Sequence, residues 1–210
     1  MTCLHYPGRT DRSNGFLPDH FQFVAYRADY WFIDYYHRKT GVGIYAQATK
    51  FLQLLWILPT ILAGLIVPAL KNQENKMTVL QLTSVSRLLF FSHILLGIML
   101  AADSYLLYEC FLPGDFSQGF HSLLLMMPGY LLFIFSTVLA AYFSANRFLK
   151  INLIGSVLCF AIILILDFLL ISRYSYTGVA IASSVSYAIK VIFFIIMMNR
   201  KTSVSFKGFF

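Results

Sequence analysis

The sequence predicts an all-α membrane protein, a polytopic bundle of about six transmembrane helices. Hydrophobic residues make up 59% of the chain, charged residues only 12%, and the mean hydropathy is +0.71. A soluble domain of this composition would have too little polar surface, so lipid must solvate much of the chain. Several apolar runs also reach the roughly 20 residues that a helix rising about 1.5 Å per residue needs to cross hydrocarbon.

The predicted spans differ in how many charges they carry. In chain order they are 16–36, 51–70, 88–108, 119–145, 151–172 and 177–199. The second and fourth spans have no charged residue, and the third, fifth and sixth have one each, namely Asp103, Asp167 and Lys190. Outside the bundle we expect a polar N-terminal segment at 1–15 and a short cytoplasmic tail at 201–210.

The net charge of +7 would suggest a nucleic-acid partner in a soluble protein, but the distribution of the charges points to a membrane topology. Basic residues gather in alternate connections: Lys71, Lys76, Arg87, Arg147, Lys150, Arg200, Lys201 and Lys207. The positive-inside rule therefore predicts a multi-pass protein of the cytoplasmic (inner) membrane, with its C-terminus in the cytoplasm. Arg38 and Lys39 are the exception, because alternation places them outside.

The first span carries the candidate site. Arg27 and Asp34 are seven residues apart and share a helix face, whereas Asp29 points elsewhere. A charge near the middle of a membrane is costly, so Arg27 should face protein or water and be paired. The pattern fits either a functional cavity or a structural ion pair.

Two lysines are further candidates, and both have a simpler explanation. Lys50 lies near the outer end of the second span and Lys190 in the inner part of the last. Either side chain could snorkel to the interface. Asp103 and Asp167 lie near outer helix ends, where we expect hydration.

Other sequence features predict no catalytic chemistry. No nucleophile has an adjacent base, no residues have metal-ligand spacing, and there is no glycine-rich phosphate loop, so we expect neither an enzyme nor a cofactor. The last span instead opens with Gly178, Ala182 and Ser186 four residues apart, a spacing that lets helices approach closely. We expect this face to pack against another helix.

Five stretches resemble, in order, the polysaccharide or O-antigen flippases. They are YRADYWFID at 26–34, VGIYAQATKF at 42–51, LLWILP at 54–59, SANRFLKIN at 144–152 and YTGVAIASSVSY at 176–187. They are similar to that family's R-x-D helix, its V-G-x-Y element, the proline-containing helix that follows, its cytoplasmic turn and its late G-x-x-G-A-A-type helix start. The similarity covers about residues 21–200.

The resemblance implies a member of the multidrug/oligosaccharidyl-lipid/polysaccharide exporter superfamily. Such proteins move lipid-linked oligosaccharide across the membrane by alternating access, for surface polysaccharide, O-antigen and lipopolysaccharide biosynthesis. Their cavities hold the anionic substrate with cationic residues, a role that falls here to Arg27, with Lys50 and Lys190 behind it. Asp29 or Asp34 would take part in ion coupling.

The resemblance covers only the C-terminal half of such a flippase. A separate N-terminal half, a homodimer of halves or a truncated remnant would each account for this. The competing functional class is a membrane scaffold within a polysaccharide biosynthesis system that transports nothing.

Overall fold

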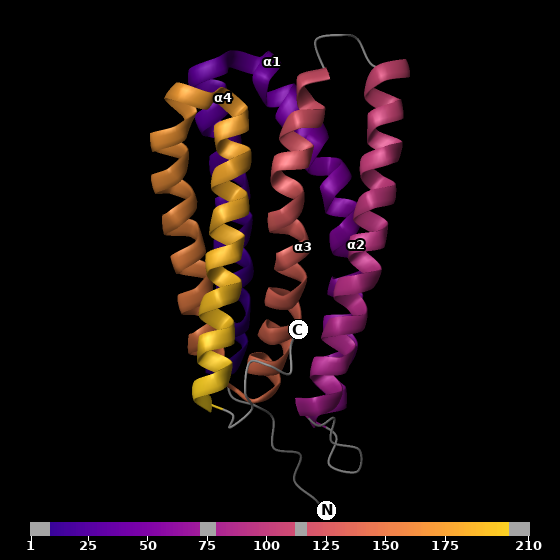
Figure 1. The fold of residues 1–210 in the computed structure, drawn as a ribbon. Helices are drawn as coiled ribbons and strands as arrows, with labels where there is room; N and C mark the ends of the chain where they lie inside the picture. The colour runs from indigo at the N-terminus through magenta and orange to yellow at the C-terminus, as the bar shows by residue number, and fades with distance from the viewer. Residues whose placement is uncertain (1–8, 72–78, 112–116, 202–210) are drawn as a thin grey trace, which may run out of the picture.

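The described part of the chain is helical apart from short turns (Figure 1). The computed structural model describes all residues except 1–8, 72–78, 112–116 and 202–210, and leaves out some side chains inside the helices, including those of 9–27. The elements are α1 (Arg9–Lys71), α2 (Val79–Cys110), α3 (Ser117–Ala145) and α4 (Leu149–Lys201).

Four helices are long and apolar enough to cross a membrane, which supports the all-helical, multi-pass architecture. The candidate spans are Gly41–Leu70, Ser84–Cys110, Gly119–Ala145 and Leu149–Lys201. The prediction of six separate helices is therefore wrong. Two of the four elements are much longer than one crossing requires, and each of them doubles back.

The reversal in α4 lies at Ser175. Its 53 residues would extend about 80 Å as a straight helix, more than twice the hydrocarbon thickness. Ser175 has non-helical backbone angles, φ 58° and ψ −145°, and the two arms pack against each other (Figure 1). A Cβ added to Gly155 would lie 2.3 Å from the Phe194 ring, and one added to Gly178 would lie 2.7 Å from the Leu170 carbonyl oxygen. The predicted spans 151–172 and 177–199 are thus the two arms of α4.

The reversal in α1 is evident from its side-chain contacts. The Tyr45 hydroxyl lies 2.7 Å from the Asp29 carboxyl group, and the Tyr30 hydroxyl lies 2.9 Å from Thr49 Oγ1. Residues this far apart in a straight helix would be separated by about 24 Å or more. Figure 1 shows α1 turning over at the upper end of the bundle.

Helix α3 is central, because it packs mainly against α4 and α1 and also supports α2. The approach to α4 is very close at Gly129, where an added Cβ would lie 2.4 Å from Ser184 Cα. Ser184 Oγ donates to the Leu125 carbonyl oxygen at 2.6 Å, which ties the same two helices together. Helix α2 exposes large apolar side chains such as Leu88, suited to lipid.

The predicted small-residue face of the last span is confirmed as a packing surface. Ala182 and Ser186 are both fully buried, and Gly178 is buried against the other arm of α4. Small side chains allow the arm after Ser175 to approach its neighbours this closely.

Exposed basic residues gather at one end of the bundle. Arg147 and Lys150 flank the turn between α3 and α4, and Arg200 and Lys201 end α4 at the same, lower end in Figure 1. The opposite end carries the α4 reversal and the end of α2.

Candidate functional site

A cluster of polar side chains is buried between α1 and α4. Asp29 and Tyr45 come from α1, and Asp167 and Ser183 come from α4; we call these four residues the aspartate cluster. Asp29 is 3% exposed, and the other three are not exposed at all. Two carboxyl groups buried in a predominantly apolar bundle are the most unusual feature of the described residues.

Asp29 receives two hydrogen bonds within the cluster. The Tyr45 hydroxyl donates to Asp29 Oδ2 at 2.7 Å, and Ser183 Oγ donates to the same oxygen at 3.2 Å. The two hydroxyl oxygens are 3.4 Å apart. Asp29 Oδ1 has no hydrogen-bond donor among the described residues.

Asp167 lies beside Asp29, and the two carboxyl groups interact directly. Neither Asp167 oxygen has another hydrogen-bond partner in the described part of the chain. A buried polar atom without a partner carries a large desolvation cost, so this carboxyl group requires an explanation.

The reversals of α1 and α4 build the cluster. Asp167 and Ser183 stand the same number of residues before and after Ser175, so the antiparallel arms bring them to one level. The reversal of α1 in the same way brings Asp29 beside Tyr45. A site assembled across two reversals depends on both helices keeping their register.

Lys190 adds a positive charge farther along the last arm of α4, toward the basic end of the bundle. It is 5% exposed, and its Nζ lies 4.9 Å from the centre of the Phe133 ring and 5.8 Å from that of Phe194, distances typical of cation–π contacts. Cys159 lies within electrostatic range of both Lys190 and Asp29. The lysine and the aspartates therefore share one buried region.

Polar side chains continue along α4 toward the basic end. Ser156 and Asn152 are buried there, at 5% and 6% exposure. Asn152 Nδ2 donates to the Ala140 carbonyl oxygen at 3.0 Å and to Ser144 Oγ at 2.9 Å. These two hydrogen bonds from Asn152 connect α4 to α3 near the basic end of the bundle, where their role is structural.

The predicted site residues fall in different places. Asp29 and Lys190 lie in the interior, and Lys190 does not extend to the surface. Asp34 and Lys50 are exposed and take no part in the aspartate cluster. Arg27 belongs to α1, but its side chain lies outside the described residues.

Three members of the cluster are not among the residues that the sequence predicts for the site. Asp167 was expected to be hydrated at a helix end, but it is fully buried, because the α4 reversal covers it. Its isolation in an apolar span was the available signal. Tyr45 and Ser183 had no comparable signal, since a tyrosine and a serine are common in apolar helices.

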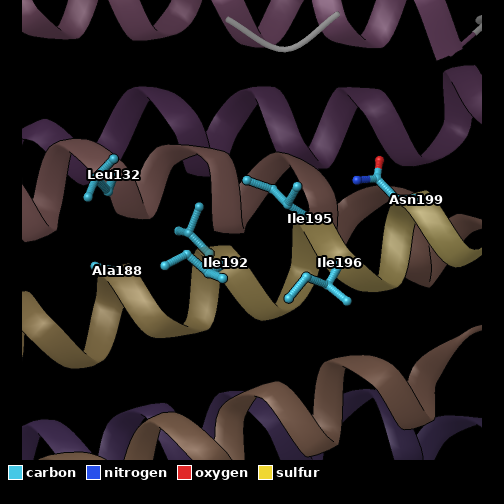
Figure 2. Close-up of a pocket in the computed structure, with 7 residues that line it drawn as sticks. Leu132, Ala188, Ile192, Ile195, Ile196 and Asn199 are labelled. Atoms are coloured by element: carbon cyan, nitrogen blue, oxygen red, sulfur yellow. The ribbon is translucent and has the colours of Figure 1, made fainter. Parts of the chain in front are cut away.

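A second feature is an apolar groove of about 350 Å³ between α3 and the last arm of α4 (Figure 2). It is lined by Leu132, Ala188, Val191, Ile192, Ile195, Ile196 and Asn199. Ile192 and Ile196 remain exposed beside it. Asn199 is its one polar lining residue, so the groove suits hydrocarbon and offers no reactive group.

The aspartate cluster offers oxygen atoms alone, which suit a proton or a small hard cation. No group of three or more His, Cys, Asp or Glu side chains that could hold a metal ion occurs among the described residues. Comparison of the chain with protein-family models, with curated proteins and with solved structures gives no match.

Proposed function

We propose that this chain is part of a membrane transporter of the polysaccharide flippase type, which moves lipid-linked oligosaccharide across the cytoplasmic membrane for surface polysaccharide or O-antigen biosynthesis. The observation that supports transport is the aspartate cluster with Lys190 nearby, buried inside an apolar helical bundle. The family resemblance of five sequence stretches supplies the substrate class.

The buried charges favour a transporter over a scaffold. Each ionisable group in a membrane interior costs several kcal/mol relative to an apolar side chain. A scaffold has no need for buried ionisable groups, whereas a transporter needs polar groups away from lipid to bind its substrate or a coupling ion. Asp29 and Lys190 both belong to this buried region.

In the proposed mechanism, cationic side chains bind the anionic part of the substrate, and a carboxyl group responds to the coupling ion. Arg27 and Lys190 are the cations that we assign to the substrate, with Lys50 at the exposed margin. Asp29 is the carboxyl group that we assign to coupling, in place of the exposed Asp34.

The proposed topology follows from the basic end of the bundle. We place that end in the cytoplasm by the positive-inside rule. In this topology both arms of α1, both arms of α4, and the helices α2 and α3 each cross the bilayer, which would make six crossings. Because the resemblance covers half of a flippase, a separate N-terminal half or a second copy of this chain would complete the cavity.

Deletion of the gene and complementation test the proposal. The readouts are surface polysaccharide and lipid-linked oligosaccharide retained on the cytoplasmic face of the membrane. Wild type should restore surface polysaccharide and clear the retained precursor, whereas Asp29→Asn and Lys190→Met should leave precursor trapped at normal protein levels. Asp34→Asn is the matched control, an exposed aspartate of the same helix, and should complement.

Two outcomes would contradict transport. An unchanged surface after deletion would favour a remnant. Full complementation by both Asp29→Asn and Lys190→Met would favour the scaffold, because a scaffold depends on the shape of the bundle and not on its buried charges.

A further inference from the structure

We propose that Asp29 and Asp167 together form a binding site for one exchangeable proton, held between their carboxyl groups at neutral pH. The proposal goes beyond transport, because it holds whether or not the chain moves a substrate. It rests on the contact between the two carboxyl groups, on their burial and on the shortage of donors around them.

The two carboxyl groups have fewer hydrogen-bond donors around them than they have oxygen atoms. The two carboxyl groups present four oxygen atoms, and the described donors reach only Asp29 Oδ2. Asp167 has the Asp29 carboxyl group as its neighbour and no donor from elsewhere in the described residues. A proton on one carboxyl group supplies the missing donor and joins the pair.

The balance of charge gives the same number of protons. Two ionised carboxylates in contact repel strongly where water cannot screen them, so a buried pair of this kind retains a proton. Lys190 is the one buried lysine or arginine among the described side chains, and it can balance one carboxylate. With one proton bound, the region is neutral overall.

The other groups that face the pair do not replace that proton. Tyr45 of α1 and Cys159 and Tyr187 of α4 interact with Asp29, and Tyr130 of α3 and Lys190 of α4 interact in turn with those groups. The tyrosines and the cysteine are neutral at physiological pH in an apolar setting. The Tyr45 hydroxyl already donates its proton to Asp29, so it supplies no hydrogen bond to the Asp167 oxygens.

A small cation such as Na⁺ is the competing ligand. It would also bind carboxylate and hydroxyl oxygens, but it would separate the two carboxyl groups as it entered. The direct contact between Asp29 and Asp167 is the geometry that a shared proton requires.

Infrared spectroscopy of the full chain, purified in lipid at neutral pH, tests the proposal. A protonated carboxyl group has a C=O stretch that an ionised one lacks. We expect this band in the wild type, with a shift when aspartate carries a ¹³C carboxyl group and a further shift in D₂O. Asp167→Asn and Asp29→Asn should each abolish the band, because the remaining carboxyl group ionises and is paired by hydroxyl or amide donors.

Asp34→Asn, which removes an exposed carboxyl group of the same helix, should retain the band. Persistence of the band in both Asp29→Asn and Asp167→Asn, or its loss in Asp34→Asn, would overturn the assignment.

The wild type alone also decides the question if a variant fails to fold. An aspartic acid in water is ionised at neutral pH, so absence of the band from the wild type refutes the shared proton. Replacement of potassium by sodium should leave the band unchanged; loss of the band in sodium alone would establish a cation site instead.

Discussion

Replacing Gly129 by alanine should destabilise the bundle more than any other single added methyl group at a described glycine. The new Cβ would lie 2.4 Å from Ser184 Cα, 2.9 Å from its Oγ and 3.0 Å from its Cβ. The first of these atoms belongs to the backbone of α4, so the two helices must move apart. Overpacking of this kind costs about 1–3 kcal/mol.

The hydrogen bond beside this contact adds to the effect. Ser184 Oγ donates to the Leu125 carbonyl oxygen at 2.6 Å, and separation of α3 from α4 would lengthen that bond, at a cost of about 1 kcal/mol. Alanine also favours the helix over glycine by about 1 kcal/mol, so we expect Gly129→Ala to lower the free energy of unfolding by about 1–3 kcal/mol in total.

Reversible unfolding in mixed detergent–lipid micelles, followed by circular dichroism, measures the change. Gly64→Ala is the matched control, because a Cβ there meets nothing within 4 Å and alanine favours a helix by about 1 kcal/mol. Equal stabilities for Gly129→Ala and Gly64→Ala would refute the close approach of α3 and α4.

Three further substitutions probe the cluster and the packing around it. Tyr45→Phe removes the 2.7 Å bond to Asp29 and should cost about 1.5–3 kcal/mol in the same unfolding assay, as for a bond to a charged group; no loss would place the tyrosine hydroxyl elsewhere. Gly155→Ala meets the Phe194 ring at 2.3 Å and should destabilise the protein unless Phe194→Leu is added, so a double variant no better than the single one would contradict that contact. Asn152→Ala removes two hydrogen bonds at the turn between α3 and α4 and should lower the thermal midpoint, whereas an unchanged midpoint would show that this fastening is dispensable.

The sequence was sufficient to predict a helical membrane bundle but not the number of its helices. Hydropathy shows how long an apolar stretch is, and the short polar interruption between spans 151–172 and 177–199 looks like an ordinary loop. The structure instead reverses α4 at Ser175 with hardly any loss of helix. A single serine carries no sequence signal for such a turn, in contrast to a glycine or proline.

The candidate site was predictable only in part, for a similar reason. Asp29 was identified because a charge in an apolar span is unusual on its own. Its partner Asp167 lies far along the chain, and nothing local relates the two residues. Their contact depends on both helix reversals, which are long-range consequences of packing.

The reversal at Ser175 has a consequence for how the protein is made. Both ends of α4 lie at the basic end of the bundle, near Lys150 and Arg200, and the tip between its arms lies at the opposite end. Under the proposed topology, the translocation machinery would have to accept α4 as a hairpin and carry its tip, with Arg173, across the hydrocarbon once. The basic residues at its two ends would each favour the cytoplasmic side, so both ends of the hairpin would specify the same orientation.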